Sequence, residues 1–345
     1  MTTAKILEFF LTTRCTLNCK MCLCAIPYQP VKRDTPKEEL FRHFALAFPL
    51  YDEIGRVELI GGEPMLHPDL PEIVLELLKY RDKFKKIRIT TNGTIVPSPA
   101  LIDAVHQAQA AGLEFDFLVD DYGPLSHKLS EIRDVLAREH IDCRVDCYTG
   151  DDQRGNGWLC YGDFTLREHE TEQQLWEKFS HCLCPKLQFH DTHDGVIYSC
   201  VYAMTGVLLG KFSLRDGEFV DLKDSSKSDA EKKRILETFL KHPTEACRYC
   251  DSFREDSPRF PAAEQLPRGE ASACSRSAAW PSSRRCGARS AAACAATASR
   301  STSTRLSCRS ARSLPTFTLP FPLWIGSSGS SSWAVKSSCT LSLRI

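Results

Sequence analysis

Strand-like and helix-like patterns alternate through the first 150 residues, and this alternation limits the folds that the chain can adopt. Short runs rich in β-branched and aromatic residues predict strands at 5–12, 56–60, 86–91, 114–119 and 143–149. Apolar residues at helical spacing predict helices between them, at 35–48, 69–84, 99–111 and 125–140. Repeated strand–helix units favour a parallel sheet with right-handed crossovers, which is an α/β fold. The pattern leaves open whether the sheet is open or curls into a barrel.

The chain has 17 cysteines among 345 residues, which is far above the usual share for an intracellular enzyme. A disulfide framework is typical of short secreted chains, but this chain is long and its start lacks the layout of a signal peptide. No stretch approaches the roughly 18 consecutive apolar residues of a membrane span. We therefore expect a cytoplasmic protein that does not enter a membrane and uses clustered cysteines as metal or iron–sulfur ligands.

Charge divides the chain into two unlike parts. Residues 271–345 hold nine Arg, one Lys, 20 Ser and no acidic residue, so the preceding 270 residues carry 34 basic and 44 acidic side chains. A body this acidic has no general attraction for nucleic acid, and we expect no nucleic-acid partner. The tail shows no sustained period and predicts no packed core. An out-of-frame translation is the favoured interpretation, and a disordered basic tail is the alternative.

Cys15, Cys19 and Cys22 form a C-x3-C-x2-C motif directly after the first predicted strand. This position is the carboxyl edge of a parallel sheet, where ligand-binding loops lie. Three thiols so spaced can hold three of the four irons of a cubane cluster and leave the fourth open, as a catalytic metal site requires. The alternatives are three unrelated buried thiols or a zinc knuckle, for which Cys24 is the nearby fourth ligand.

The segment Gly61-Gly62-Glu63-Pro64 follows the second predicted strand and so lies at the same edge of the sheet. Its two glycines permit unusual backbone angles and the close approach of a ligand to main-chain groups. A carboxylate beside them can engage an ammonium group. Taken alone, the segment is typical of an ordinary strand-to-helix turn, and it becomes informative through its register with the cysteine loop.

Together with the run from Thr90 to Thr94 after the third strand, these motifs resemble the radical S-adenosylmethionine (SAM) enzymes over roughly residues 4–150. The resemblance implies a partial (β/α)6 barrel whose three clustered cysteines hold a [4Fe–4S] cluster. The open iron would be chelated by the amino and carboxylate groups of SAM. The cofactor-binding residues implied around the methionyl ammonium are Gly61, Gly62, Glu63 and Pro64.

Two further residues at strand ends are weaker candidates for contact with SAM or substrate. Asn92 follows the third strand, where related enzymes contact SAM, and Asp120 follows the fourth. Asp120 and the adjacent Asp121 are equally well explained as solvated loop acids. Met21 stands where the family usually has an aromatic residue, and it should still pack over the cofactor. No catalytic residue is assigned beyond the cluster ligands.

A second group of cysteines lies in the region after residue 180. A C-x10-G-x4-C pattern spans a predicted hairpin at 187–200, and a C-x2-C pair follows a predicted helix at 229–241. Its members are Cys184, Cys200, Cys247 and Cys250. Four thiols suffice for a closed site that holds either a cubane or zinc.

Beside a radical SAM core, this second pattern resembles the auxiliary-cluster extensions called SPASM and Twitch. The Twitch arrangement with one auxiliary cluster fits better, because residues 251–272 contain no cysteine. Cys24 and Cys182 lie close to ligand positions and are possible substitutes. The remaining cysteines before residue 251 are interpreted as small buried hydrophobic residues; they are Cys143, Cys147 and Cys160.

The resulting domain prediction has three parts: a core barrel at 1–180, a hairpin-plus-helix extension with a second [4Fe–4S] cluster at 181–260, and the basic tail at 261–345. The resemblance implies reductive cleavage of SAM to a 5′-deoxyadenosyl radical, which removes hydrogen from a substrate. An auxiliary cluster would accept an electron and make the outcome a net two-electron oxidation. A flavodoxin- or ferredoxin-type electron donor is also implied.

The substrate is predicted only as a small molecule, a carbohydrate-like compound or a peptide. Relatives that modify peptides often carry an N-terminal recognition domain, and here the barrel begins by residue 5, which favours the first two classes. One alternative is a peptide-modifying maturase that uses a separate recognition partner. The other is a non-catalytic iron–sulfur sensor or electron carrier, which would have no need of a site for the SAM ammonium.

Overall fold

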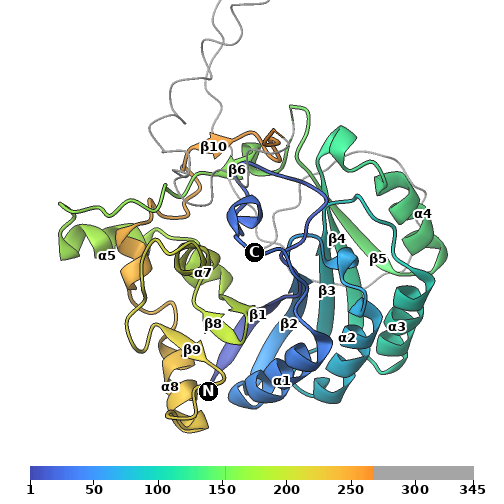
Figure 1. Ribbon diagram of the computed structural model, residues 1–345, viewed down its shortest axis with the longest axis horizontal. Coiled ribbons are helices and arrows are strands. Elements are labelled where there is room, and N and C mark those ends of the chain that lie inside the picture. The colour runs from blue at the N-terminus through green and yellow to red at the C-terminus, as the bar shows by residue number, and fades with distance from the viewer. Residues whose placement is uncertain (152, 268–345) are drawn as a thin grey trace, which may run out of the picture. The chain divides into compact units, whose positions relative to one another are not determined.

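A computed structural model describes residues 1–151 and 153–267 of the chain (Figure 1). Its main feature is an eight-stranded sheet in the order β5-β4-β3-β2-β1-β7-β8-β9. The strands that pair in parallel are β1 (Thr3–Phe10), β2 (Glu53–Ile60), β3 (Lys86–Thr91), β4 (Glu114–Asp121), β5 (Asp142–Cys147) and β7 (Phe189–His193). The predicted α/β fold with a largely parallel sheet is confirmed. The sixth parallel strand, β7, pairs with β1 rather than with β5.

Four helices follow the first four strands and cover one face of the sheet (Figure 1). They are α1 (Lys37–Ala47), α2 (Leu70–Leu77), α3 (Pro99–Ala110) and α4 (Leu129–Arg138). The helix-facing side of each strand is apolar, and it forms the main core with the buried sides of the helices. Phe9 of β1 contacts Phe44 of α1 edge to face at 4.7 Å between ring centroids. This packing fixes the carboxyl ends of the strands, and therefore the loops after them.

Short 3-10 turns adjoin several of these elements. They lie at Ile26–Tyr28, Phe48–Leu50, Pro64–Leu66, Leu78–Tyr80, Gly123–Leu125, Arg154–Asn156 and Glu245–Arg248. One of these turns shortens the helix predicted at 69–84: the α-helix ends at Leu77, and the chain continues as a 3-10 turn.

The region after residue 150 extends the same sheet. The predicted hairpin forms β7 and β8 (Val196–Tyr198), with Asp194 and Gly195 both at positive φ in the turn, and β9 (Phe219–Asp221) pairs with β8. The other elements are α5 (Glu172–Ser180), α6 (Cys184–Leu187), α7 (Val201–Leu208), α8 (Asp229–Thr238) and the small pair β6 (Trp158–Leu159) and β10 (Arg259–Phe260). The predicted boundary at 180/181 therefore does not interrupt the sheet.

The predicted tail begins at 261, and all of it from residue 268 onward lies outside the described residues. In the part of the chain that is described, no helix combines the length and apolar character needed to cross a membrane.

Candidate functional site

The cysteine loop after β1 and the glycine pair after β2 are in direct contact. The main-chain N–H of Gly62 donates to the carbonyl of Thr12 at 2.8 Å, and that of Glu63 donates to the carbonyl of Arg14 at 2.9 Å. A Cβ atom on Gly62 would lie 2.0 Å from the Arg14 oxygen and 2.9 Å from Cβ of Cys15. The sequence predicts that these glycines let a ligand approach main-chain groups closely. In the structure they also allow two chain segments to touch.

The three thiols of the first motif lie close enough to interact with one another. Cys19 is buried, and Cys15 and Cys22 are half-buried. Burial first, and then the neighbouring Cys22 charge, raises the pKa of Cys19 to about 12, and burial raises that of Cys15 to about 12. The pKa of Cys22 is lowered to about 7, chiefly by a hydrogen bond from the Cys24 thiol. Iron binding would have to displace protons from Cys15 and Cys19.

The sulfurs of Cys15 and Cys19 also accept hydrogen bonds from N–H groups. Cys15 Sγ accepts from Leu17 N at 3.4 Å and from Asn92 Nδ2 at 3.5 Å. Cys19 Sγ accepts from Gln265 Nε2 at 3.2 Å. Donors of this kind stabilise negative charge on sulfur.

Glu63 is 0% exposed, and both of its carboxylate oxygens are engaged by the protein. Oε1 accepts from Thr91 Oγ1 at 2.9 Å and from Met65 N at 3.2 Å, and Oε2 accepts from Asn92 N at 2.9 Å. Burial outweighs these donors and raises the pKa of Glu63 to about 7. The carboxylate therefore ties the second motif to the third strand, and its contact with an ammonium group stays a prediction.

Asn92 connects the third motif to the cysteine loop. Its Nδ2 donates to Thr16 Oγ1 at 3.0 Å, and its Oδ1 accepts from Thr94 N at 3.2 Å. Thr16 and Thr94 share a further hydrogen bond of 2.6 Å between their hydroxyls. All three motifs singled out in the sequence thus meet at the carboxyl edge of the sheet. Pro64 is buried at the start of a 3-10 turn beside them.

The two acids at the end of β4 have different environments. Asp120 accepts a hydrogen bond from Tyr122 Oη at 3.2 Å, and burial, with the nearby Asp146 charge, raises its pKa to about 7. The Tyr122 ring stacks on Tyr148 at 5.4 Å between centroids. Asp121 instead accepts from the main-chain N–H of Gly123 at 2.8 Å and shapes the loop. Of the pair, Asp120 is the acid held in a buried aromatic setting.

A row of charged side chains on the sheet face opposite α1–α4 did not emerge from the sequence. Its members are register neighbours from β7 to β4, namely Asp191, Glu8, Glu58, Arg88 and Asp116. All five are buried. Arg88 pairs with Asp116 through two hydrogen bonds of 2.7 and 2.5 Å. The available signal was a polar residue at an alternate position within each otherwise apolar strand.

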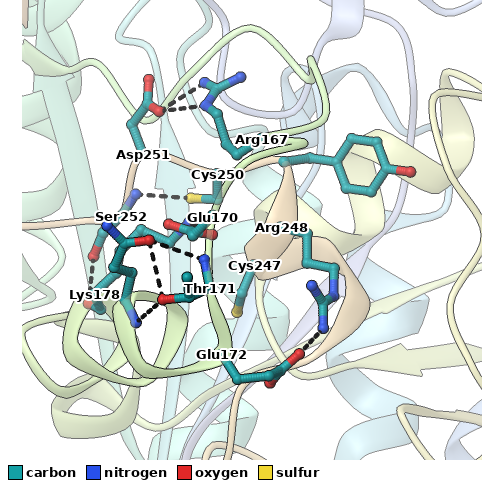
Figure 2. Close-up of polar contacts among 12 residues, drawn as sticks. Arg167, Glu170, Thr171, Glu172, Lys178, Cys247, Arg248, Cys250, Asp251 and Ser252 are labelled. Carbon is teal, nitrogen blue, oxygen red and sulfur yellow. Dashed lines mark hydrogen bonds and ion pairs between the residues drawn. The ribbon is translucent and has the colours of Figure 1, made fainter.

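The four cysteines of the second group line one small cavity of about 30 Å³, and Cys182 lines it with them. Cys200 is the N-cap of α7, and its sulfur accepts from Ala203 N at 3.4 Å. Cys250 Sγ accepts from Ser252 N at 3.2 Å (Figure 2). Burial raises the pKa of Cys247 to about 11. The sequence identified Cys182 only as a possible substitute, and the structure places it in the same cavity.

The segment that carries Cys250 is clamped to its surroundings. Arg167 donates to Asp251 Oδ1 through Nε at 2.9 Å and through Nη2 at 2.6 Å (Figure 2). Leu183 N donates to the Phe253 carbonyl at 2.7 Å, which joins the 182–184 turn to the same segment. Among residues 1–151 and 153–267, no three His, Cys, Asp or Glu side chains are arranged to hold a single metal ion.

Residues 9–124 match the family model described as the radical SAM superfamily. This stretch contains the C-x3-C-x2-C motif, the Gly-Gly-Glu-Pro segment and Asn92. Over these residues, about a third of its length, the chain is similar to the radical SAM superfamily.

Several curated proteins are similar to part of the chain. Molybdenum cofactor biosynthesis protein 1 of Drosophila melanogaster is 36% identical over 92 residues, which cover 26% of this chain and 16% of that protein. Its counterpart in Bos taurus is 30% identical over 157 residues, or 41% and 23%. The GTP 3',8-cyclase of Aquifex aeolicus (strain VF5) is 34% identical over 95 residues, or 27% and 29%. The chain spans less than a third of the length of each of these relatives.

Two solved structures align with most of the chain at low identity. The complex of BtrN with AdoMet and 2-DOIA has a TM-score of 0.48 and 14% identity, over 75% of this chain and 97% of BtrN. SuiB of Streptococcus suis, bound to S-adenosylmethionine, has a TM-score of 0.37 and 12% identity, over 74% and 77% of the two chains.

Proposed function

We propose that the chain is a radical SAM enzyme whose SAM-binding cluster is held by Cys15, Cys19 and Cys22. The observation that carries this proposal is the close approach of Gly62 to the Arg14 carbonyl and to Cβ of Cys15, because it joins the cysteine loop and the glycine motif into one site. The match of residues 9–124 to the radical SAM family model supports SAM and a [4Fe–4S] cluster as the cofactors.

The residues present fit such a cluster. Three mutually interacting thiols supply soft donors, and N–H groups already point at two of the sulfurs. A cluster held by Cys15, Cys19 and Cys22 would supply the electron for reductive cleavage of SAM and so the means of abstracting hydrogen from the substrate. The chain contributes orientation and exclusion of water. Main-chain groups of Gly61 and Gly62 bind the methionyl ammonium, while Glu63 holds the loop in place and adds negative charge.

Cys184, Cys200, Cys247 and Cys250 hold a second [4Fe–4S] cluster in this proposal. Their convergence on one cavity supports it, as does the hydrogen bond from Ala203 N to Cys200 at the start of α7, where a helix N-terminus favours a thiolate. A second cluster held by these four cysteines would supply an electron acceptor, which the oxidation of a substrate radical needs. The reaction is then a net two-electron oxidation, with a flavodoxin- or ferredoxin-type protein as the donor to the first cluster.

Charge on the inner sheet face favours a neutral or cationic, carbohydrate-like substrate. The arginines Arg56 and Arg88 are each paired with a carboxylate, whereas Glu8 and Asp191 are paired with one another. A triphosphate would gain no net attraction from a face on which carboxyl groups outnumber arginines. GTP, which the names of the cyclase relatives suggest, is therefore the second candidate, and a peptide brought by a separate recognition partner is the third.

Iron content and SAM cleavage test the proposal. After anaerobic reconstitution we expect about eight irons per chain, since each cubane holds four. Cys19→Ala and Cys250→Ala should each retain about four. The reduced wild type should convert SAM to 5′-deoxyadenosine, measured by mass spectrometry, and Cys19→Ala should not.

Cys147→Ala is the matched control, because it removes a thiol that lies against Thr149 outside both groups. It should keep about eight irons and the SAM cleavage of the wild type. Intact SAM after incubation with the reduced, iron-loaded wild type would establish the electron-carrier alternative. Four irons in both the wild type and Cys250→Ala would show that the protein has no auxiliary cluster.

A further inference from the structure

A segment from the far end of the described chain lies along the cysteine loop. We call residues 263–266 the strap. Lys20 N donates to the carbonyl of Glu264 at 2.7 Å, and Leu266 N donates to the carbonyl of Asn18 at 2.8 Å. Cys19 and Gln265 lie opposite each other as an antiparallel bridge between these two bonds. The strap thus pairs with the loop as a short β-strand would.

The side chain of Gln265 makes three further contacts within this pairing. Its Oε1 accepts from Asn18 N at 2.8 Å, and its Nε2 donates to the Ala263 carbonyl at 2.8 Å and to Cys19 Sγ at 3.2 Å. If the Gln265 amide were turned by 180°, its NH2 group would face the Asn18 N–H and its oxygen would face the Ala263 carbonyl. Neither of these pairs can form a hydrogen bond. The network therefore fixes the amide orientation, with an N–H directed at the sulfur.

From this geometry we propose that Gln265 is a positioning residue for the SAM-binding cluster, holding Cys19 and donating a hydrogen bond to its thiolate. This inference rests on the proposed function, in which Cys19 is a cluster ligand. A donor on the ligating sulfur stabilises the more negative, reduced form of a cluster and so raises its reduction potential. Cys19 is only 7% exposed, so the strap also limits access of water to this ligand.

The contact between Gln265 and Cys19 connects two parts of the chain that are 246 residues apart. The strap follows the segment that carries Cys247 and Cys250, so it brings the end of the auxiliary region onto the SAM site. Replacement of Gln265 would then alter the SAM cluster without changing any of its three ligands.

Two substitutions test the contact. Gln265→Ala removes it, and Gln265→Glu keeps the shape and the acceptor for Asn18 N but cannot donate to sulfur. The readout is the midpoint potential of the cluster whose electron paramagnetic resonance signal changes when SAM is added, followed in an anaerobic redox titration. Both variants should give a lower potential than the wild type. Because outer-shell partners typically contribute 10–100-fold to metal affinity, iron should leave this site to a chelator about tenfold faster.

Glu264→Gln is the matched control within the strap. It removes an exposed ion pair between Glu264 and Lys20, whose side chains are 48% and 37% exposed, and leaves the main-chain pairing intact. Its potential and iron release should equal those of the wild type. An unchanged potential and unchanged iron release in both Gln265 variants would overturn the inference while the cluster itself remains. A wild type without a SAM-responsive signal would instead overturn the proposed function.

Discussion

The carboxylate of Glu63 accepts a hydrogen bond from the main-chain N–H of Asn92 at 2.9 Å, which joins the loop after β2 to the end of β3. The same carboxylate accepts from Thr91 and Met65, and Asn92 in turn donates to Cys15 and Thr16. Three motifs that are separated along the sequence are therefore one hydrogen-bonded unit. A substitution in one of these motifs should therefore also shift the other two.

Glu63→Gln should destabilise the protein before any cofactor is present. The glutamine NH2 group cannot accept from a main-chain N–H, so in either amide orientation one donor, Asn92 N or Met65 N, loses its partner, at a cost of about 1–3 kcal/mol. Urea unfolding at pH 5, below the pKa of about 7 that burial gives Glu63, measures this difference before the wild type has to ionise a buried acid. Glu131→Gln on α4, which loses an exposed pair with Lys128, should change the free energy of unfolding by less than about 0.5 kcal/mol. Equal effects of the two substitutions would contradict the role given to Glu63.

Gly62→Ala should disrupt the cysteine loop. The added Cβ would lie 2.0 Å from the Arg14 oxygen, and a main-chain atom cannot move aside without shifting the loop. We expect iron bound after reconstitution to fall by about four per chain, because only the first cluster is affected. Gly112→Ala is the control, since Gly112 has φ +88° but open space around it and carries only the strain of about 1 kcal/mol for a positive φ. Full iron content in Gly62→Ala would show that the loop tolerates the displacement.

Removal of one partner from the buried pair of Arg88 and Asp116 should strongly lower the free energy of unfolding. Both residues are less than 10% exposed, so Asp116→Ala leaves a guanidinium without its main partner and should cost about 3–5 kcal/mol in unfolding free energy. The double variant Arg88→Met with Asp116→Ala should be less destabilised than the sum of the single variants, which a double-mutant cycle measures. Glu131→Ala, which loses only an exposed pair with Lys128, should cost less than about 0.5 kcal/mol. Additive effects at Arg88 and Asp116 would mean that the pair is not coupled.

Local pattern predicted the elements that depend on local sequence. The five predicted parallel strands and the hairpin at 187–200 are present, because β-branched residues and an Asp194-Gly195 turn specify them within a few residues. Helix α7 was not predicted, since Val201–Leu208 is buried over most of its surface and shows no amphipathic period. Fully apolar segments of this length do not distinguish a buried helix from a strand.

The cysteine motifs could be predicted because their spacing is itself the signal, whereas their partners could not. Gln265 reaches Cys19 from 246 residues away, and nothing in the composition of 263–266 marks it. The contact of Glu8 with Asp191 likewise depends on β7 pairing with β1, which is a property of topology. Asp120 and Asp121 looked equivalent in the sequence, and only the direction of their side chains separates them.

The buried carboxyl groups of Glu8 and Asp191 should make stability fall as pH rises. Burial is the main cause of the raised pKa of both groups; that of Asp191 is raised to about 6, and that of Glu8 well above its usual value. A group whose pKa is higher in the folded state adds stability below its unfolded pKa, near 3.9 for Asp, and loses it as pH rises through the folded value. For Asp191 this window runs from about pH 4 to about pH 6, and the change is about 3 kcal/mol at most.

Asp191→Asn should remove this dependence, because the amide stays neutral. We expect the free energy of unfolding of Asp191→Asn, relative to the wild type, to increase by about 2 kcal/mol between pH 4.5 and pH 7.5, since the wild type alone must ionise a buried acid. Asp224→Asn is the control: hydrogen bonds from Ser226 lower the pKa of Asp224 to about 2, so its own window lies below pH 4. Its difference from the wild type should stay constant across the same range. A constant difference for Asp191→Asn as well would show that Asp191 is ionised in the folded protein throughout, with Glu8 alone holding the proton.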